Sequence, residues 1–169
     1  MLALLGMTLI LSGCFGVGLS LCEKEEQRIR VLEQWIISLG ILCNEIKRKG
    51  QPLPFAVEEC KFHTVGEVFE FYNEVIKKRE EKNLLEVWKE ELELYLKKTI
   101  LNKEGRKRIH SLEGILGYEE EKLQIKMLQM GIENIHNYKT DMEEGKREKQ
   151  KMMMLLSFAG GIVMVLLLV

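Results

Sequence analysis

The strongest constraint on the fold of this chain is the distribution of its charges. All 25 Lys and Arg and all 26 Asp and Glu of the 169 residues lie between Glu23 and Lys151, and the two ends carry none. About 40% of the middle segment is charged, against roughly 25% in a typical globular domain. The net charge of -1 therefore conceals an uneven distribution, with two apolar ends around a highly charged middle. This pattern argues against a simple soluble enzyme, a basic nucleic-acid binder and a disulfide-rich secreted domain.

The apolar ends are expected to be two transmembrane helices around one domain. Residues 1–22 would form a helix about 33 Å long and residues 152–169 one of about 27 Å, against a hydrocarbon core of roughly 30 Å. No Lys or Arg precedes the first span. Basic residues follow it and precede the second: Lys24, Arg28, Arg30, Lys146, Arg147, Lys149 and Lys151. By the positive-inside rule, we expect both termini on one side of the cell membrane and the domain of residues 23–151 in the cytoplasm.

Small residues recur at four-residue spacing within both expected spans. They are Ser12, Gly16 and Ser20 in the first span and Ser157 and Gly161 in the second. Such stripes let helix backbones approach closely in lipid, although Gly and Ser are common in membrane helices in any case. We expect these residues to form a packing interface, either within one chain or between chains of a homo-oligomer.

The N-terminus also has an alternative interpretation, in which the protein is lipid-anchored outside the cytoplasm. Leu11-Ser12-Gly13-Cys14 resembles a bacterial lipobox, whose Cys is lipidated after signal cleavage. Two features argue against it. The basic n-region of a secretory signal is absent, and the apolar run continues beyond Cys14 to Leu21. The alternative product would be an extracytoplasmic, membrane-tethered helical interaction protein.

The middle segment has the pattern of helices throughout, because Pro occurs only at 52 and 54 and no strand-like alternation is present. We expect helices over about 23–49, 54–61, 64–79, 83–99 and 103–116, and a long helix from residue 118 that leads toward the second span. Thr64 and Glu67 fit a capping box, and Asn83 fits an N-cap. The expected apolar positions are Ile29, Leu32, Ile36, Leu39, Cys43 and Ile46; Val68, Phe71, Tyr72 and Val75; Leu85, Trp88, Leu92, Tyr95 and Thr99; and Ile125, Leu128, Ile132, Ile135 and Met142. The predicted class is all-α, an antiparallel helical bundle flanked by an N-terminal and a C-terminal transmembrane helix.

Motifs for catalysis or cofactor binding are absent from the sequence. The three His residues, His63, His110 and His136, fall on separate expected elements without metal-ligand neighbours. No Cys-x-x-Cys occurs, and there is no phosphate-binding Gly-rich loop. A small basic cluster is balanced by acidic neighbours: Lys103, Arg106, Lys107 and Arg108. We therefore expect a non-enzymatic protein with no metal or cofactor, no small-molecule substrate and no nucleic-acid partner. Cys43 and Cys60 are expected to stay reduced in a cytoplasmic domain.

Several short motifs, in their order and spacing, are similar to those of the stage III sporulation protein AB family, over essentially the whole chain. They are Arg30, Leu32, Leu39 and Glu45-Ile46, the Pro52-Leu53-Pro54-Phe55-Ala56 turn, Trp88, the segment Leu116-Gly117-Tyr118-Glu119-Glu120-Glu121-Lys122-Leu123-Gln124, and a C-terminal apolar helix with Gly161. Glu120 stands where the family usually has Asp. Glu is a poorer helix cap, so this departure concerns the local geometry of the helix start.

The resemblance implies a component of the channel between mother cell and forespore, similar to the cytoplasmic domain of the type II secretion inner-membrane platform protein. It implies a secretion-type ATPase and other membrane components of the same sporulation complex as partners. The domain would lie on the mother-cell side, facing the forespore. We expect the interaction surface at Leu116, Gly117, Glu119, Glu120 and Gln124. The other interpretation of this segment is that it only caps and starts the long helix.

Overall fold

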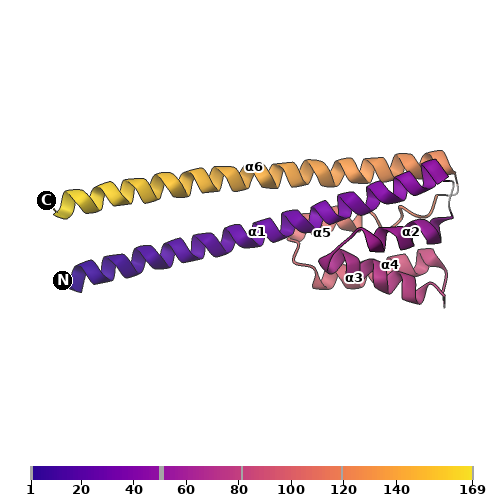
Figure 1. Cartoon of the computed structure of the whole chain (residues 1–169), viewed down its shortest axis with the longest axis horizontal. Coiled ribbons are helices and arrows are strands. Elements are labelled where there is room, and N and C mark those ends of the chain that lie inside the picture. The colour runs from indigo at the N-terminus through magenta and orange to yellow at the C-terminus, as the bar shows by residue number, and fades with distance from the viewer. Residues whose placement is uncertain (1, 50–51, 81, 119, 169) are drawn as a thin grey trace. The chain divides into compact units, whose positions relative to one another are not determined.

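The computed structural model is helical throughout the part of the chain that it describes. It describes the backbone of residues 2–49, 52–80, 82–118 and 120–168 and the side chains of residues 23–47, 52–80, 82–118 and 120–152. The helices are α1 (Leu2–Lys49), α2 (Leu53–Phe62), α3 (Gly66–Lys78), α4 (Leu84–Lys98), α5 (Lys103–His110) and α6 (Glu121–Leu168) (Figure 1). No residue in these ranges forms a strand, so the all-α prediction is confirmed. The chain divides into two compact units: Met1–Gln27 with Thr140–Val169, and Arg28–Lys139.

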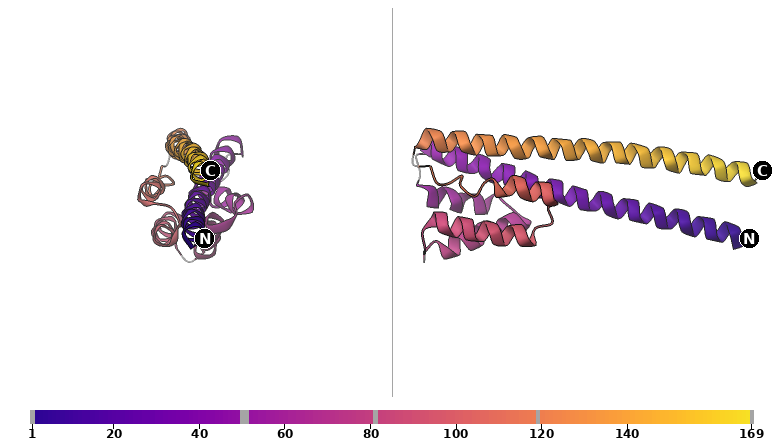
Figure 2. Two further views of the ribbon diagram at one scale, coloured as in Figure 1. Left: turned by 90° about the vertical axis from the view of Figure 1, so that its left-hand side faces the viewer. Right: turned by 180° about the vertical axis from the view of Figure 1, so that it is seen from behind.

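The part of α1 within the second unit forms the centre of that unit. In the end-on view of Figure 2, the other helices of the unit surround it. The predicted apolar stripe is buried at five of its six positions, and only Ile36 is half-exposed. Trp35 and Leu42, which the stripe did not include, are fully buried as well. The buried face is wider than predicted because helices pack against α1 from several directions.

An aromatic cluster forms the core where α1, α3 and α4 meet. Its members are Trp35, Phe71, Tyr72, Trp88 and Tyr95. The rings of Trp35 and Trp88 meet edge to face, an arrangement that aromatic quadrupoles favour, with centroids 6.3 Å apart. Both indole N–H groups are satisfied, since Trp35 Nε1 donates to the Tyr95 hydroxyl at 3.0 Å and Trp88 Nε1 to the Leu112 carbonyl at 3.1 Å. The core is thus held by oriented hydrogen bonds as well as by apolar burial.

The predicted capping box at the start of α3 is wrong. Thr64 Oγ1 donates instead to the carbonyl oxygen of Cys60 at 2.9 Å, so the Thr64 side chain closes the end of α2. The residue before α3 is Val65, whose side chain cannot cap, and Gly66 supplies the turn with a φ of 63°. Glu67, the other half of the predicted box, bonds to groups far away in the sequence.

Glu67 links α3 to the end of α4 and the loop that follows it. Its carboxylate accepts hydrogen bonds from the Tyr95 hydroxyl at 2.7 Å, from the Thr99 hydroxyl and from the Ile100 backbone N–H at 3.4 Å. On the other side of the same loop, Arg28 Nε donates to the Ile100 carbonyl at 3.0 Å. One carboxylate and one guanidinium therefore fix the path of the chain between α4 and α5.

Helices α4 and α5 both begin at Asn caps. Asn83 accepts a bond from the Leu85 N–H at 2.9 Å, as predicted, and Asn102 accepts one from the Gly105 N–H at 2.8 Å. Helix α5 ends at His110, earlier than the predicted residue 116. The chain continues in tight turns, one of them closed by the bond from the Ile115 N–H to the Leu112 carbonyl at 3.1 Å. These turns place three buried residues against the core: Leu112, Ile115 and Leu116.

The first part of α6 packs closely on the turn after α5. A Cβ placed on Gly131 would lie 3.0 Å from Leu112 Cδ2 and 3.1 Å from Ile115 Cδ1. Leu128 and Ile135, one turn to either side, are fully buried. Gly131 therefore allows α6 to approach the turn more closely than a larger residue would permit.

In the first unit, an ion pair joins α1 and α6. Lys146 Nζ lies 3.1 Å from Glu26 Oε2. Over the residues whose side chains the structure describes, no helix has both the length and the apolar composition needed to cross a membrane. The predicted spans, residues 1–22 and 152–169, lie outside these side chains except for Met152, as do the predicted packing residues Ser12, Gly16, Ser20, Ser157 and Gly161.

Candidate functional site

The predicted interaction segment divides into buried and exposed positions. Leu116 and Gln124 have only 2% and 5% of their surface exposed, so they do not belong to an interaction surface, and the prediction is corrected for them. Gly117 and Glu120 are exposed, and Glu119 lies outside the described residues. The turn before α6 folds onto the core and carries Leu116 inward. Gln124 is the first position of the face of α6 that packs inward.

The start of α6 has the geometry of a helix N-terminus. The Gln124 backbone N–H donates to the Glu120 carbonyl oxygen at 2.9 Å, which makes Glu120 the residue before the first helical turn. The amide nitrogen Nε2 of Gln124 is buried and forms no hydrogen bond with the residues the structure describes. The segment thus has a clear structural role, and of the predicted interaction residues that the structure describes, Gly117 and Glu120 are the exposed ones.

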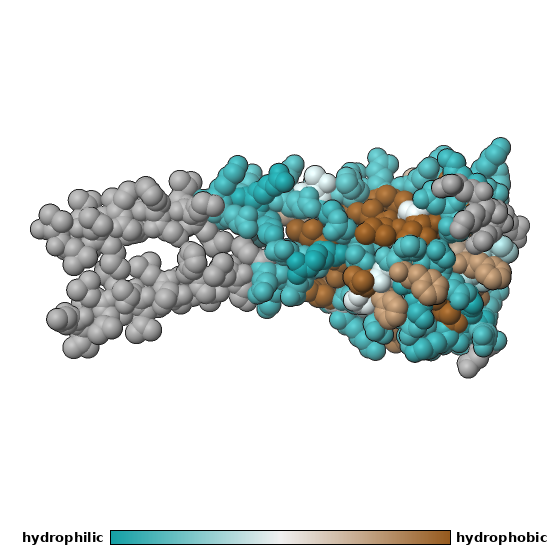
Figure 3. Space-filling view, viewed as in Figure 1, coloured by the Kyte–Doolittle hydropathy of each residue, from teal (hydrophilic) through white to brown (hydrophobic). Residues whose placement is uncertain are grey.

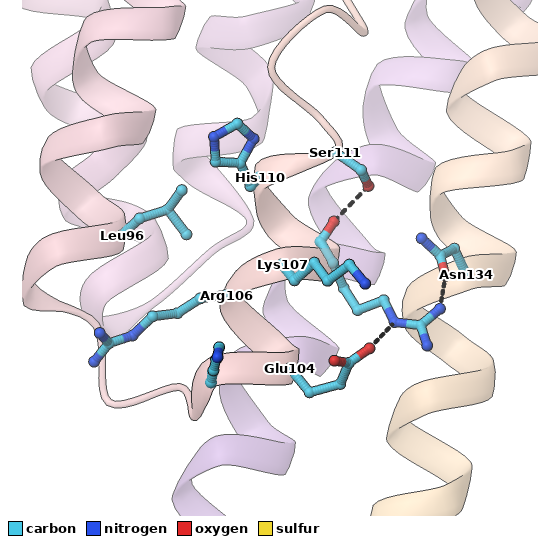
Figure 4. A pocket seen from close by; sticks show the side chains of 9 residues that line it. Leu96, Glu104, Arg106, Lys107, His110, Ser111 and Asn134 are labelled. Carbon is cyan, nitrogen blue, oxygen red and sulfur yellow. Dashed lines mark hydrogen bonds and ion pairs between the residues drawn. The ribbon is translucent and has the colours of Figure 1, made fainter.

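A basic pocket of about 650 Å³ lies on α5 (Figure 4). Its lining consists of Lys103, Arg106, Lys107, Arg108, His110, Glu104, Ser111, Leu96 and Asn134. Four of these residues are Lys or Arg and only one is acidic, so the pocket is positively charged in a chain whose net charge is -1. The sequence shows the basic cluster. It gives no signal that Leu96 of α4 and Asn134 of α6 complete the lining.

The two arginines of this pocket are held by the protein itself. Arg106 donates to the Leu101 carbonyl at 2.9 Å and to the Thr99 carbonyl at 3.2 Å. Arg108 pairs with Glu104 at 3.1 Å, and a dashed line in Figure 4 marks its further bond to Asn134 of α6. By contrast, Lys103 and Lys107 are exposed and have no ion-pair partner in the described part of the chain.

A second groove, of about 450 Å³ and opposite in charge, lies between α3 and α4. Its lining includes four acidic residues and two lysines: Glu67, Glu70, Glu74, Glu91, Lys78 and Lys98. Lys78 pairs with the buried Glu91 at 2.6 Å and so neutralises part of this charge. Leu94, which is 42% exposed, adds an apolar side chain to the groove. Helix α4 thus contributes to both a basic and an acidic recess.

Apolar side chains are also exposed on the second unit. Figure 3 shows brown, hydrophobic areas among the teal ones on the face it presents. The large apolar residues with at least 40% exposure in α1, α2 and the loop after α2 are Ile37, Phe55, Phe62 and Val65. Single exposed apolar residues are normal on a protein surface, so these residues by themselves assign no contact surface.

The described cysteines are buried and reduced. Cys60 has no exposed surface, and its thiol donates to the Ser38 carbonyl at 3.2 Å. Burial raises the pKa of the Cys60 thiol to about 12 and also raises the pKa of Cys43. Both thiols therefore stay protonated at neutral pH and are poor nucleophiles. Within the described side chains, no group of three or more His, Cys, Asp or Glu has the arrangement of a metal site.

The fold defines the class of the protein as an all-α helical bundle. The basic pocket on α5 and the acidic groove between α3 and α4 are both open to solvent. A family model described as stage III sporulation protein AB matches residues 3–169. The chain belongs to the stage III sporulation protein AB family.

A solved structure titled "Stage III sporulation protein AB (SpoIIIAB)" is similar to the chain, with a TM-score of 0.64 and 17% sequence identity. The match covers 72% of this chain and 98% of that one. At this identity, the likeness establishes the fold alone. No curated protein matches the chain.

Proposed function

We propose that the chain is a non-enzymatic platform component of the sporulation channel between mother cell and forespore. In this proposal, residues 1–22 and 152–169 are membrane spans, and the domain of residues 23–151 lies in the cytoplasm of the mother cell. The domain docks a secretion-type ATPase and assembles with other membrane components of the same complex. The observation that carries the proposal is the family match over residues 3–169.

The charge distribution supports the membrane part of the proposal. A middle segment in which about 40% of the residues are charged, between two uncharged, apolar ends, suits a domain that is held at a membrane surface by both ends. The packing of the second unit supports the docking part. Its aromatic core and the bonds of Glu67 and Arg28 hold the helices in fixed positions, and fixed positions reduce the ordering cost of binding.

The sidedness of the domain can be measured by thiol labelling of the full chain in intact sporulating cells. In a background with Cys14→Ser and Cys22→Ser, we place a single reactive thiol at the exposed Glu80, as Glu80→Cys. The remaining natural thiols, Cys43 and Cys60, are buried and protonated, so they react slowly. We expect an impermeant maleimide to label the Glu80→Cys variant only after lysis.

The matched control is the same background without Glu80→Cys, which should stay unlabelled before and after lysis. Labelling of Glu80→Cys in intact cells would reverse the topology and contradict the platform proposal. It would favour the lipid-anchored alternative built on Cys14, which lipid labelling that depends on Cys14 would then test directly.

The docking part is tested by co-purification of the full chain with the companion ATPase from membranes of sporulating cells. We expect the two proteins to co-purify. A chain that is in the membrane with its domain in the cytoplasm, yet never co-purifies with the ATPase, would contradict the docking part and leave the topology intact.

A further inference from the structure

We propose that the basic pocket on α5 is a docking site for an acidic segment of a partner protein, bound through the ammonium groups of Lys103 and Lys107. This inference deepens the proposed function and rests on it for the identity of the partner, since it names the surface at which a protein partner docks. It places docking on α5 and not at the start of α6, where two of the predicted residues are buried.

The spacing of the two lysines matches what a partner segment can present. Lys103 and Lys107 are four residues apart on α5, so they lie one above the other on the same face of the helix. Carboxylates four apart on a partner helix repeat at the same interval of about 6 Å. Both ammonium groups are exposed and have no ion-pair partner in the described part of the chain, so binding breaks no existing ion pair.

The other residues of the pocket provide fixed surroundings for the two lysine ammonium groups. Arg106 is held by two backbone carbonyls, and Arg108 is held by Glu104 and Asn134, so both guanidinium groups are fixed in position. Leu96 of α4 adds an apolar surface beside them. Fixed guanidinium groups and an apolar side chain make the pocket more selective for its partner segment than a pair of mobile surface lysines would be.

A polypeptide fits this pocket better than a nucleic acid does. Helix α5 has eight residues and is about 12 Å long, so its basic face is short. Nucleic-acid binding needs a longer array, with about 6–10 phosphate contacts in a typical specific complex. The arginines, which usually supply bidentate phosphate contacts, are already bonded within the protein. Two lysine ammonium groups beside an apolar residue suit a short stretch of carboxylates.

The alternative occupant is a second copy of this chain, because the groove between α3 and α4 is acidic. Glu67 and Glu91 of that groove are engaged in bonds within their own chain, so most of its charge is not available. This leaves Glu70 and Glu74, and Glu74 already pairs with Lys77 at 2.7 Å. The observations therefore favour a different protein, and self-association becomes an outcome of the test.

The test uses the full-length chain in its native membrane. A water-soluble carbodiimide joins a lysine amine directly to a carboxylate that contacts it. We treat membranes from sporulating cells and identify the cross-linked peptides by mass spectrometry. We expect Lys103 and Lys107 to be joined to Asp or Glu of an acidic segment in another protein, and nuclease treatment should leave this product unchanged.

The charge-reversed variant Lys103→Glu/Lys107→Glu should reduce capture of that partner by roughly tenfold or more, since like charges would then meet. The matched control is Lys122→Glu/Lys126→Glu, which makes the same change in charge at the same spacing on the exposed start of α6. The control should capture the partner normally. Reversing the cross-linked carboxylates of the partner to Lys should restore capture by the Lys103→Glu/Lys107→Glu chain.

The outcomes separate this inference from the proposed function. Equal capture by wild type, variant and control would overturn the inference while leaving the platform function intact. Cross-links only to the acidic groove of a second copy, or loss of the product with nuclease, would overturn it in favour of self-association or nucleic acid. Cross-links to an acidic segment of a protein other than the ATPase, with charge-swap rescue, would uphold the pocket and contradict ATPase docking there.

Discussion

At the scale of single residues, Glu67 is a side chain of α3 whose hydrogen bonds reach a distant part of the bundle. It accepts bonds from two hydroxyl groups and one backbone N–H, and these come from the end of α4 and the following loop. Tyr95, one of the donors, also receives the Trp35 indole N–H. Loss of the carboxylate therefore leaves the Tyr95 hydroxyl without its acceptor in a largely buried site, and leaves the Thr99 hydroxyl only its longer bond to the Tyr95 oxygen, at 3.3 Å.

We expect Glu67→Ala to lower the free energy of unfolding of the second unit by about 2 kcal/mol, because buried hydroxyl groups lose a charged acceptor. The measurement is urea unfolding of the full chain in detergent micelles, followed by tryptophan fluorescence. Both tryptophans of the chain, Trp35 and Trp88, lie in the core of this unit.

The matched control is Glu70→Ala, one turn further along α3. Glu70 is exposed and lies in the same acidic groove, but it makes no hydrogen bond or ion pair within the described residues. It should change the free energy of unfolding by less than about 0.5 kcal/mol. Equal effects of the two substitutions would show that Glu67 acts only through its charge.

The same residue shows where local sequence patterns stop being informative. Thr64 and Glu67 have the spacing of a capping box, but both side chains bond elsewhere: Thr64 to the end of α2 and Glu67 to Tyr95 and Thr99. A pattern over four residues contains no information about a hydroxyl 28 residues away. By contrast, Asn83 was correctly predicted as a cap because its bond to the Leu85 N–H is local.

At the scale of helices, the close approach of α6 to the turn after α5 depends on Gly131. Helix propensity alone would favour any residue other than Pro here, by up to about 1 kcal/mol relative to Gly. The short distances from a Cβ at this position to Leu112 and Ile115 explain why a Gly is needed in this arrangement. The helix was predicted from the sequence, but nothing in the sequence indicates what Gly131 packs against.

We expect Gly131→Leu to lower the free energy of unfolding by about 1–2 kcal/mol, since the cost of overpacking exceeds the gain in helix propensity. The same urea titration checks this. Gly145→Leu is the control, because a Cβ at Gly145 meets nothing within 4 Å and the substitution gains only helix propensity. If Gly131→Leu were as stable as wild type, the close approach of α6 would not be required.

The helix boundaries show a second limit to what can be predicted from the sequence. The apolar spacing of α3 and α4 was predicted well, since all four expected core residues of α3 and four of the five of α4 are buried. The end of α5 was placed six residues too late, because Leu112, Ile115 and Leu116 are apolar at helix-like spacing. In the structure, they reach the core from tight turns, and only the tertiary contacts distinguish the two arrangements.

At the scale of the whole molecule, the charge distribution leads to a prediction about membrane insertion. An Arg at the centre of a membrane helix costs about 2.5–3.5 kcal/mol in insertion experiments. Leu11 and Val163 lie near the middle of the two proposed spans. We expect the double variant Leu11→Arg/Val163→Arg to lose membrane association, which is measured by the fraction of the full chain that stays in the pellet after carbonate extraction.

The control adds the same two charges just inside the charged segment, as Gln27→Arg/Gln150→Arg. Both of these positions are exposed, so the control should fold and remain in the pellet like the wild type. Both variants add two Arg residues, so a difference between them reports where the charges lie in the chain and not how many were added. A double variant Leu11→Arg/Val163→Arg that stays in the carbonate pellet would show that the ends do not anchor the chain through a lipid core.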